Sequence, residues 1–253
     1  MYRSVLTQVL SLMKNIDITL LIPAFNPPAG WHHVFIERYL DFCDMFGAEI
    51  PVVLVNDGST RDIRGEADLI ALQLGQKFKY TGYQYNKGKG GALKFGASMC
   101  ETDRIVFTDT DFPYDNQSMK SVIKSVQSTS GLVTGFRSEA YYADVSLFRT
   151  ILSKSLRWLN KSLLGLPVND TQCGLKAFDG QVKAILLKCE TDRFLIDLEL
   201  LLAASNQNIK ITPVPVKLRD DIGFTRFNAS VLLKEVFSFF KLIWKYRVLK
   251  KKF

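Results

Sequence analysis

Strand-like runs alternate with helical patterns through the first half of this 253-residue chain. Apolar, β-branched runs predict strands at residues 18–24, 52–55, 78–83, 104–108 and 132–135. Helical periodicity lies between them, near residues 34–46, 66–74, 91–99 and 118–127. Strand–helix–strand units at this spacing predict an α/β fold with a Rossmann-like, mostly parallel sheet flanked by helices.

The second half of the chain is more helical. Its pattern predicts a long helical segment at residues 144–164, a polar turn at 169–174, a helix near 194–206, a strand near 209–216 and a last helix near 228–250. Because no linker composition separates these segments, we expect one domain over residues 1–225, with residues 226–253 as its basic amphipathic extension.

The positive charge is concentrated at the C-terminus. The formal net charge is +8, and Glu235 is the only carboxylate after Arg226, which favours a nucleotide, nucleic acid or anionic membrane as partner. The chain has no run of about 18 uninterrupted apolar residues, no signal-peptide core and no CxxC pair among its four cysteines. We therefore expect a cytoplasmic protein with reduced cysteines that can still lie on a membrane.

Polar residues follow four of the predicted strands. Asn26 follows the first, the Asn-Asp-Gly-Ser run 56–59 the second, Asp109 and Asp111 the fourth, and Arg137 the fifth. Because ligands of parallel sheets bind beyond the carboxyl ends of the strands, these residues are expected to share one site.

The Asp-Thr-Asp run is the most informative of these clusters. Carboxylates at i and i+2 can turn together toward a hard divalent cation, which shares its coordination with substrate phosphates; the alternative is a polar turn that caps the next helix. Asp57 can accept a hydrogen bond from a base or ribose, or can belong to a simple Asp-Gly turn. The Gly-rich segment around Lys89 can bind an anion at a helix N-terminus, or can serve only close backbone packing.

Carboxylates also occur in the second half. Asp170 and Gln172 lie in the polar turn, which an apolar stretch follows. Asp197 and Glu199 lie in an otherwise apolar helix, where carboxylates are costly unless partnered. We expect at least one of these two to face a site, although Glu199 can instead point to solvent.

In this order, the segments IPAFN, VNDGS, NKGKGGAL, DTD, GFR, DTQCGLKAF and FLIDLEL resemble family-2 glycosyltransferases with the GT-A fold, over about residues 18–202. Within that family the chain is similar to the dolichyl-phosphate glucose and mannose synthases. NKGKGGA and DTQCG resemble the glucose enzymes, whereas DTDFPYD resembles the mannose enzymes, so the sugar stays open. The residue after Asn26 is not acidic, which departs from the pattern of many members.

The resemblance implies inverting transfer of a hexose from a nucleotide sugar, with UDP-glucose favoured, to a polyprenyl phosphate, with Mg²⁺ or Mn²⁺ as cofactor. It implies donor contacts by Asn26, Asp57 and Lys89, and metal and diphosphate contacts by Asp109 and Asp111. It implies phosphate contacts by Arg137 and Arg149, and a sugar and acceptor pocket lined by Asp170, Gln172 and Glu199. Asp111, Asp170 and Arg137 are the expected catalytic residues.

The acceptor decides what chemistry is needed. A phosphate acceptor is already ionised and needs positioning by arginines, whereas a hydroxyl acceptor needs a base, for which Asp170 is the first candidate. The last predicted helix carries Lys241 and Lys245 on one face and Phe240 and Trp244 on another, a pattern typical of a helix on an anionic membrane surface. A core-packed helix with a solvated basic face is the alternative.

Two other functions compete. A family-2 transferase that extends a cell-surface glycan on a saccharide acceptor would share these motifs. A basic nucleic-acid-binding protein would account for the charge, but the sequence has no recognised nucleic-acid-binding signature, and its carboxylate-rich loops would repel a phosphate backbone.

Overall fold

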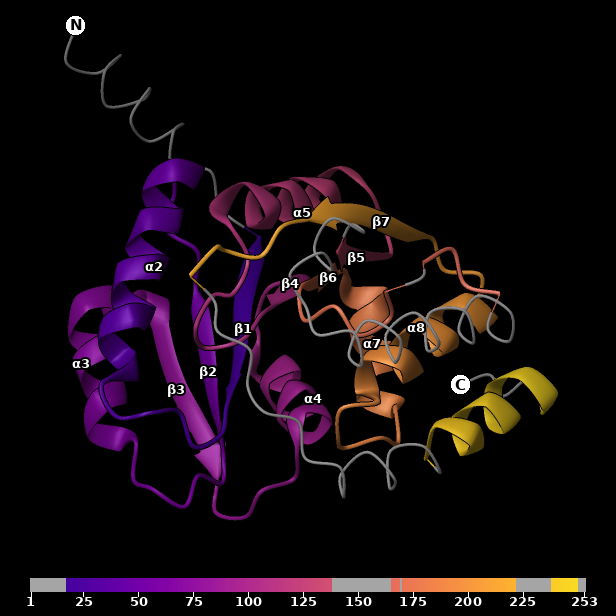
Figure 1. The fold of residues 1–253 in the computed structure, drawn as a ribbon, viewed down its shortest axis with the longest axis horizontal. Coiled ribbons are helices and arrows are strands. Elements are labelled where there is room, and N and C mark those ends of the chain that lie inside the picture. Colours follow the sequence, from indigo (N-terminus) through magenta and orange to yellow (C-terminus); the bar gives the residue numbers. More distant parts are fainter. Residues whose placement is uncertain (1–16, 138–164, 169, 222–237, 250–253) are drawn as a thin grey trace, which may run out of the picture.

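The computed structural model describes residues 17–137, 165–168, 170–221 and 238–249. Its centre is a seven-stranded sheet in the order β3-β2-β1-β4-β6-β5-β7 (Figure 1). The strands are β1 (Ile18–Ala24), β2 (Val52–Asp57), β3 (Phe78–Tyr83), β4 (Arg104–Phe107), β5 (Leu132–Arg137), β6 (Lys176–Phe178) and β7 (Ile211–Val216). Only β6 runs antiparallel to its neighbours within this sheet, and the other pairings are parallel. The predicted α/β fold with a mostly parallel sheet is confirmed.

The six strands predicted from the sequence are all present, with ends that shift by up to two residues. An apolar stretch was expected after the polar turn at 169–174, but no strand was predicted there. Residues 176–178 of that stretch form β6, which pairs with both β4 and β5. A three-residue strand is too short to show an alternating pattern, so its partners rather than its sequence define it.

Helices cover both faces of the sheet. They are α2 (Trp31–Phe46), α3 (Arg64–Leu74), α4 (Lys89–Met99), α5 (Asn116–Ser128), α7 (Gly180–Lys188) and α8 (Ile196–Asn206), with a 3₁₀ turn η1 (Gly75–Lys77). One core cluster joins the sheet to α2, α3 and α5, and the other joins it to α4, α7 and α8 (Figure 1). β1 supplies both clusters, since Leu20 and Ile22 face one and Leu21 faces the other. A strand buried on both faces reads as a continuous apolar run.

The carboxyl ends of β1, β2 and β4 lie at the same edge of the sheet because these strands are parallel neighbours. The polar clusters predicted for that edge are therefore brought together. Of the segments predicted from the sequence, residues 144–164 lie outside the described residues, as do the boundary at 225/226 and residues 228–237 of the last helix.

Residues 238–243 are α-helical and continue into a π-helical turn, η3 (Trp244–Val248). We call residues 238–248 the C-terminal helix. Leu242 and Tyr246 are buried in the core with α8, whereas Phe240 and Trp244 are 55% and 61% exposed. None of the helices in the described part of the chain has the length and apolar character needed to cross a bilayer.

One residue of the predicted basic face of this helix was placed wrongly. Lys245 is not on a solvated face: its Nζ lies 2.9 Å from Glu190 and 3.0 Å from Glu199, and its side chain is 12% exposed. Lys241 is exposed, as expected.

Candidate active site

Asp57 ends β2 and organises the Gly-rich loop between β3 and α4. It is buried, and its Oδ1 accepts hydrogen bonds from the Tyr83 hydroxyl at 2.6 Å and the Lys87 N–H at 2.9 Å. Its Oδ2 accepts from the Asn86 Nδ2 at 2.7 Å and the Gly88 N–H at 2.9 Å. Protein donors occupy both oxygens, so a contact with a base or ribose would have to share them.

Asn26 joins the loops that follow β1 and β2. Its Oδ1 accepts from the N–H of Thr60 at 2.9 Å and from the hydroxyl of Thr60 at 3.1 Å, and its own N–H donates to the Ser59 Oγ at 2.9 Å. Its φ of 47° lies in the left-handed region, which Asn tolerates better than most residues. Asn26 thus fixes the shape of this rim of the site.

Asp109 and Asp111 lie in a tight turn after β4. The Phe112 N–H donates to the Asp109 carbonyl at 3.1 Å, and the buried Phe112 ring packs on Phe35 of α2 with ring centroids 5.2 Å apart. The Arg219 guanidinium donates to the carbonyl oxygen of Asp111 at 3.0 Å. Partial shielding from water and repulsion by Asp109 raise the pKa of the Asp111 carboxyl.

This carboxylate pair fits a hard divalent cation. Oxygen ligands and mutual repulsion both favour Mg²⁺ or Mn²⁺ between Asp109 and Asp111. Within the described residues, no cluster of three or more Asp, Glu, His or Cys side chains forms a ready metal cage. The pair would therefore hold a metal together with phosphate oxygens and water.

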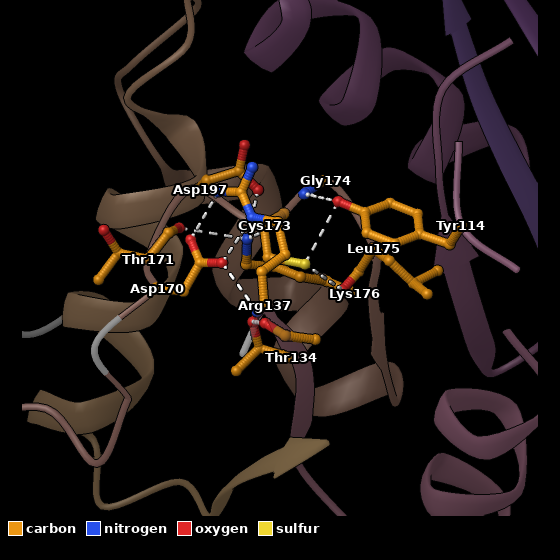
Figure 2. Close-up of polar contacts among 11 residues, drawn as sticks. Tyr114, Thr134, Arg137, Asp170, Thr171, Cys173, Gly174, Leu175, Lys176 and Asp197 are labelled. Atoms are coloured by element: carbon orange, nitrogen blue, oxygen red, sulfur yellow. Dashed lines mark hydrogen bonds and ion pairs between the residues drawn. The ribbon is translucent and has the colours of Figure 1, made fainter. Parts of the chain in front are cut away.

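Arg137 and Asp170 form a buried ion pair (Figure 2). The Arg137 Nε donates to Oδ2 of Asp170 at 2.8 Å and Nη2 donates to Oδ1 at 2.9 Å, while the Arg137 N–H also donates to Oδ2 at 3.0 Å. Burial alone would raise the pKa of Asp170, but the hydrogen bonds and charge of Arg137 outweigh it and lower the pKa. A carboxylate held in this way is a weak base, so the structure argues against Asp170 as the general base expected for a hydroxyl acceptor.

Asp197 of α8 lies between two lysines. Its Oδ1 is 2.6 Å from the Nζ of Lys176, and its Oδ2 is 3.2 Å from the Nζ of Lys89. Burial would lower the pKa of Lys89, but the charges of Asp197 and Asp109 outweigh it and raise the pKa. Lys89 therefore stays charged between the α8 carboxylate and the DTD turn.

Lys176 holds the DTQCG turn in place (Figure 2). It is fully buried, and its Nζ donates to the carbonyls of Cys173 at 2.6 Å and Thr171 at 3.3 Å. Gly174 in this turn closely approaches the site, since a Cβ there would lie 3.0 Å from Oδ2 of Asp109 and 3.7 Å from Nζ of Lys89. The structure thus gathers the DTD turn, the Gly-rich loop and the DTQCG turn at one place.

The remaining predicted site residues are Gln172, Arg149 and Glu199. Gln172 is exposed on the DTQCG turn, next to buried neighbours. Arg149 lies outside the described residues. Glu199 is 0% exposed, so the alternative that it points to solvent is wrong. Its carboxylate contacts the C-terminal helix and the segment before α8, and no contact joins it to the DTD turn in the described structure.

The sequence named Asp197 as a candidate but did not identify its partners, Lys89 and the buried cation Lys176. A signal existed for Lys176, because a lysine between Leu175 and Ala177 in an apolar run is costly to bury without a partner. The partner itself is 21 residues away in the chain, and only the fold brings it near.

Comparisons with known proteins bear on the family and the fold of the chain. A model of glycosyl transferase family 2 matches residues 19–180. A dolichyl-phosphate beta-glucosyltransferase from Drosophila melanogaster is 25% identical over 226 residues, which cover 80% of this chain and 67% of that protein.

Solved structures share the fold. The glucosyl-3-phosphoglycerate synthase from Mycobacterium tuberculosis, in complex with phosphoglyceric acid, has a TM-score of 0.60 and 17% identity over 90% of this chain and 79% of that one. The mannosyltransferase PcManGT from Pyrobaculum calidifontis, in complex with GDP-Man and Mn²⁺, has a TM-score of 0.53 and 16% identity over 79% of this chain and 55% of that one. The chain therefore has a GT-A-type fold.

Proposed function

The chain belongs to glycosyltransferase family 2, and from that membership we propose that it transfers glucose from UDP-glucose to a polyprenyl phosphate of the dolichyl type. The observation that carries this proposal is the convergence of Asp109, Lys89 and the DTQCG turn at the carboxyl edge of the sheet. The sequence similarity to a dolichyl-phosphate beta-glucosyltransferase supports glucose as the sugar and a lipid phosphate as the acceptor.

The nucleotide binds across the ends of β1 and β2 and the Gly-rich loop. In this proposal Asp57 acts on the donor mainly by fixing the loop, since four protein donors already engage its carboxylate. Asn26 holds the neighbouring rim, and Lys89 places a positive charge beside Asp109. A charge there suits the diphosphate of the donor.

Asp109 and Asp111 would hold Mg²⁺ or Mn²⁺ against the diphosphate. When bound, the metal would offset the negative charge that develops on the leaving nucleoside diphosphate. A neighbour of similar fold is bound to GDP-Man and Mn²⁺, which supports this assignment. The chain's own contribution is to orient both carboxylates through the turn anchored by Phe112 and Arg219.

The acceptor phosphate attacks without a strong base. One of its oxygens forms a bond to the anomeric carbon of glucose from the opposite face, and the bond from that carbon to the diphosphate breaks, with its electrons leaving on the nucleoside diphosphate. The acceptor is already largely ionised near neutral pH, because its second pKa is about 6. Arg137 is proposed to position it, with Gln172 and Arg149 as further contacts.

The state of Asp170 favours this acceptor over a saccharide. A hydroxyl acceptor would need a carboxylate that takes up a proton, and the lowered pKa of Asp170 opposes that. A phosphate acceptor needs no such base, so Asp170 can instead hold the Arg137 guanidinium in a fixed orientation through their ion pair.

The C-terminal helix is proposed to contact an anionic membrane surface on the cytoplasmic side. Phe240 and Trp244 are exposed one turn apart, and Lys241 lies beside them. Phe194, in the segment before α8, is 57% exposed, and its neighbour Arg193 lines one groove with Lys241. Aromatic rings with flanking cations are typical of helices at a membrane interface.

A donor and acceptor panel tests the proposal. The protein is incubated with Mg²⁺ or Mn²⁺ and labelled UDP-glucose, UDP-galactose or GDP-mannose, with and without polyprenyl phosphate, and organic-extractable label is counted. We expect label from UDP-glucose only when the lipid phosphate is present. Transfer to a soluble saccharide without lipid would instead support a glycan-extending enzyme.

A further inference from the structure

Glu199 is a fully buried carboxylate that the proposed reaction does not use. Its Oε1 accepts from the Tyr246 hydroxyl at 2.8 Å, from the Lys245 Nζ at 3.0 Å and from the Glu190 N–H at 3.2 Å. Its Oε2 accepts from the Thr191 N–H at 2.7 Å. Burial would raise the pKa of Glu199, but the hydrogen bonds from Thr191, Tyr246 and Glu190 outweigh it and lower the pKa. The carboxylate therefore joins two segments as an ionised group.

The first of these segments is the C-terminal helix, which supplies Lys245 and Tyr246. Lys245 reinforces the junction with a second contact to Glu190 at 2.9 Å. The Tyr246 carbonyl accepts a hydrogen bond from Asn206 of α8 at 2.8 Å, and the Tyr246 ring is buried. The helix is thus docked at Glu199, with Phe240 and Trp244 exposed to the outside.

The second is the segment 189–195 between α7 and α8, which packs on the end of the Gly-rich loop and the first turns of α4. The Gly91 N–H donates to the Asp192 carbonyl at 3.0 Å, and Lys94 of α4 holds the Asp192 carboxylate at 2.6 Å. A Cβ on Gly88 would lie 2.6 Å from the Asp192 carbonyl, and one on Gly90 would lie 2.5 Å from the Thr191 carbonyl. No side chain fits between the two backbones, so a shift of segment 189–195 must move the loop.

The same loop leads into a residue proposed to bind the donor. Lys89 follows the loop as the first residue of α4, and Asp57 accepts hydrogen bonds from the N–H groups of Lys87 and Gly88 in the loop. A continuous set of contacts therefore runs from the C-terminal helix through Glu199 and segment 189–195 to the loop. These contacts are hydrogen bonds, ion pairs and close backbone packing, which transmit a displacement better than exposed side chains do.

We propose that Glu199 is a positioning residue that couples the docking of the C-terminal helix to the shape of the Gly-rich loop, and thereby to the affinity for the nucleotide. The inference rests on the proposed function only for the identity of the nucleotide. Because coupling between two sites is reciprocal, a helix held in its docked position tightens nucleotide binding, and a bound nucleotide favours the docked helix.

Removal of one hydroxyl tests the coupling with little risk to the fold. Tyr246→Phe deletes a single hydrogen bond to Glu199, and Glu199→Gln replaces a carboxylate oxygen with an amide donor that faces the Thr191 or Glu190 N–H. Tyr39→Phe is the matched control, because the Tyr39 hydroxyl is also buried and donates to the Ile50 carbonyl at 2.9 Å in another part of the core. Each variant is compared with the parent by thermal unfolding, amide hydrogen exchange of residues 86–91 and calorimetric titration with UDP.

We expect Tyr246→Phe to speed exchange of the Gly91 amide at least threefold and to raise the UDP dissociation constant at least threefold. Tyr39→Phe is expected to lower thermal stability by a similar amount and to leave both readouts at parental values. Parental exchange and parental UDP affinity in Tyr246→Phe would overturn the coupling, as would equal effects in Tyr39→Phe. If the parent binds no UDP, the proposed donor is wrong, and the exchange rates alone decide whether Glu199 couples the helix to the loop.

Discussion

The carboxylates of this site differ in the groups that hold them, and so in what each can do. Asp57 and Asp170 are surrounded by donors from the protein itself and act by fixing a loop or an arginine. Asp109 and Asp111 repel one another at the end of β4. A cation is therefore stabilised most between Asp109 and Asp111. The carboxylates of Asp57 and Asp170 already have protein donors or a counter-charge.

Replacement of Asp57 tests the role of the Gly-rich loop. Asp57→Ala removes the acceptor for the Lys87 and Gly88 N–H groups, so we expect the UDP dissociation constant to rise more than tenfold. Buried hydrogen bonds to a charged group contribute about 1.5–3 kcal/mol, which corresponds to a factor of about 10 or more in the dissociation constant. Calorimetry measures the constant.

The control for this variant is Asp179→Ala. Asp179 also accepts backbone N–H groups, from Val182 and Gly131, but at the start of α7. The Asp179→Ala variant should be less stable than the parent and bind UDP with parental affinity. An unchanged UDP dissociation constant in Asp57→Ala would mean that Asp57 only stabilises the turn.

Replacement of Asp111 tests the metal. Asp111→Asn keeps the shape of the side chain but removes its charge, so we expect at least a hundredfold loss of transfer and weaker Mn²⁺-dependent UDP binding at unchanged thermal stability. The exposed Asp44→Asn on α2 is the matched control and should behave as the parent. Parental activity in Asp111→Asn, or full parental activity in excess chelator, would contradict the metal assignment.

At the scale of elements, the C-terminal helix has two functions in this account. Its inner side docks on α8 through Glu199, and its outer side is proposed to meet the membrane. The amphipathic pattern correctly indicated exposed aromatics at Phe240 and Trp244. It misplaced Lys245, because a helical pattern gives the spacing of lysines but not which of them meets a buried carboxylate 46 residues earlier in the chain.

Charge reversal on the outer side tests the membrane proposal. Lys241→Glu should weaken sedimentation with anionic vesicles at least about tenfold, because each basic residue near such a surface contributes about 1 kcal/mol and the reversal counts twice. Trp244→Ala should also weaken it through lost apolar burial. Binding of the parent should fall as salt rises.

Two controls separate this surface from general charge and apolar effects. Lys124→Glu makes the same charge change on α5, and Leu72→Ala removes a 79% exposed apolar side chain from α3. Both should bind vesicles as the parent does. Equal loss in the control and test variants would show that the C-terminal helix has no special part in binding.

The predictability of the elements follows from their length. Six strands and most of the helices were predicted because their apolar spacing extends over several residues. β6 and α7 were not, since β6 has three residues, and α7 begins directly after it at the Asp179 cap. The edge of the sheet that carries the site was predicted because parallel strands must place their carboxyl ends together.

At the scale of the whole molecule, three buried carboxylates connect separate parts of the chain. Asp170 binds Arg137 of β5, Asp197 binds lysines of α4 and β6, and Glu199 binds the C-terminal helix. The sequence identified all three as candidates, but their partners depend on the fold. Propensity and motif order cannot supply contacts between residues so far apart in the chain.

These carboxylates predict how stability depends on pH. Their environments lower the pKa of all three groups, so each stabilises the fold above its unfolded pKa, about 3.9 for Asp and 4.3 for Glu. That stabilisation is lost as the pH falls through the lower pKa of the folded state. As far as these groups decide it, the urea midpoint of unfolding should be similar at pH 7 and pH 5. The midpoint should fall steeply below about pH 4.

Glu199→Gln serves as the comparison, because it removes one of the three titrating groups. Its midpoint should be lower than that of the parent at pH 7, and the difference should shrink toward pH 3. A parental midpoint that stays constant down to pH 3 would contradict the assigned pKa shifts.

The most direct test of the central claim compares acceptors that differ only in the phosphate. The protein is incubated with UDP-glucose, Mn²⁺ and either a polyprenyl phosphate or the polyprenol of equal chain length, and the products are analysed by mass spectrometry and by NMR of the anomeric centre. The account predicts one equivalent of UDP released for each glucosyl polyprenyl phosphate, inverted at the anomeric carbon, and no product from the alcohol. Equal glucosylation of the alcohol, or retained configuration at the anomeric carbon, would contradict it.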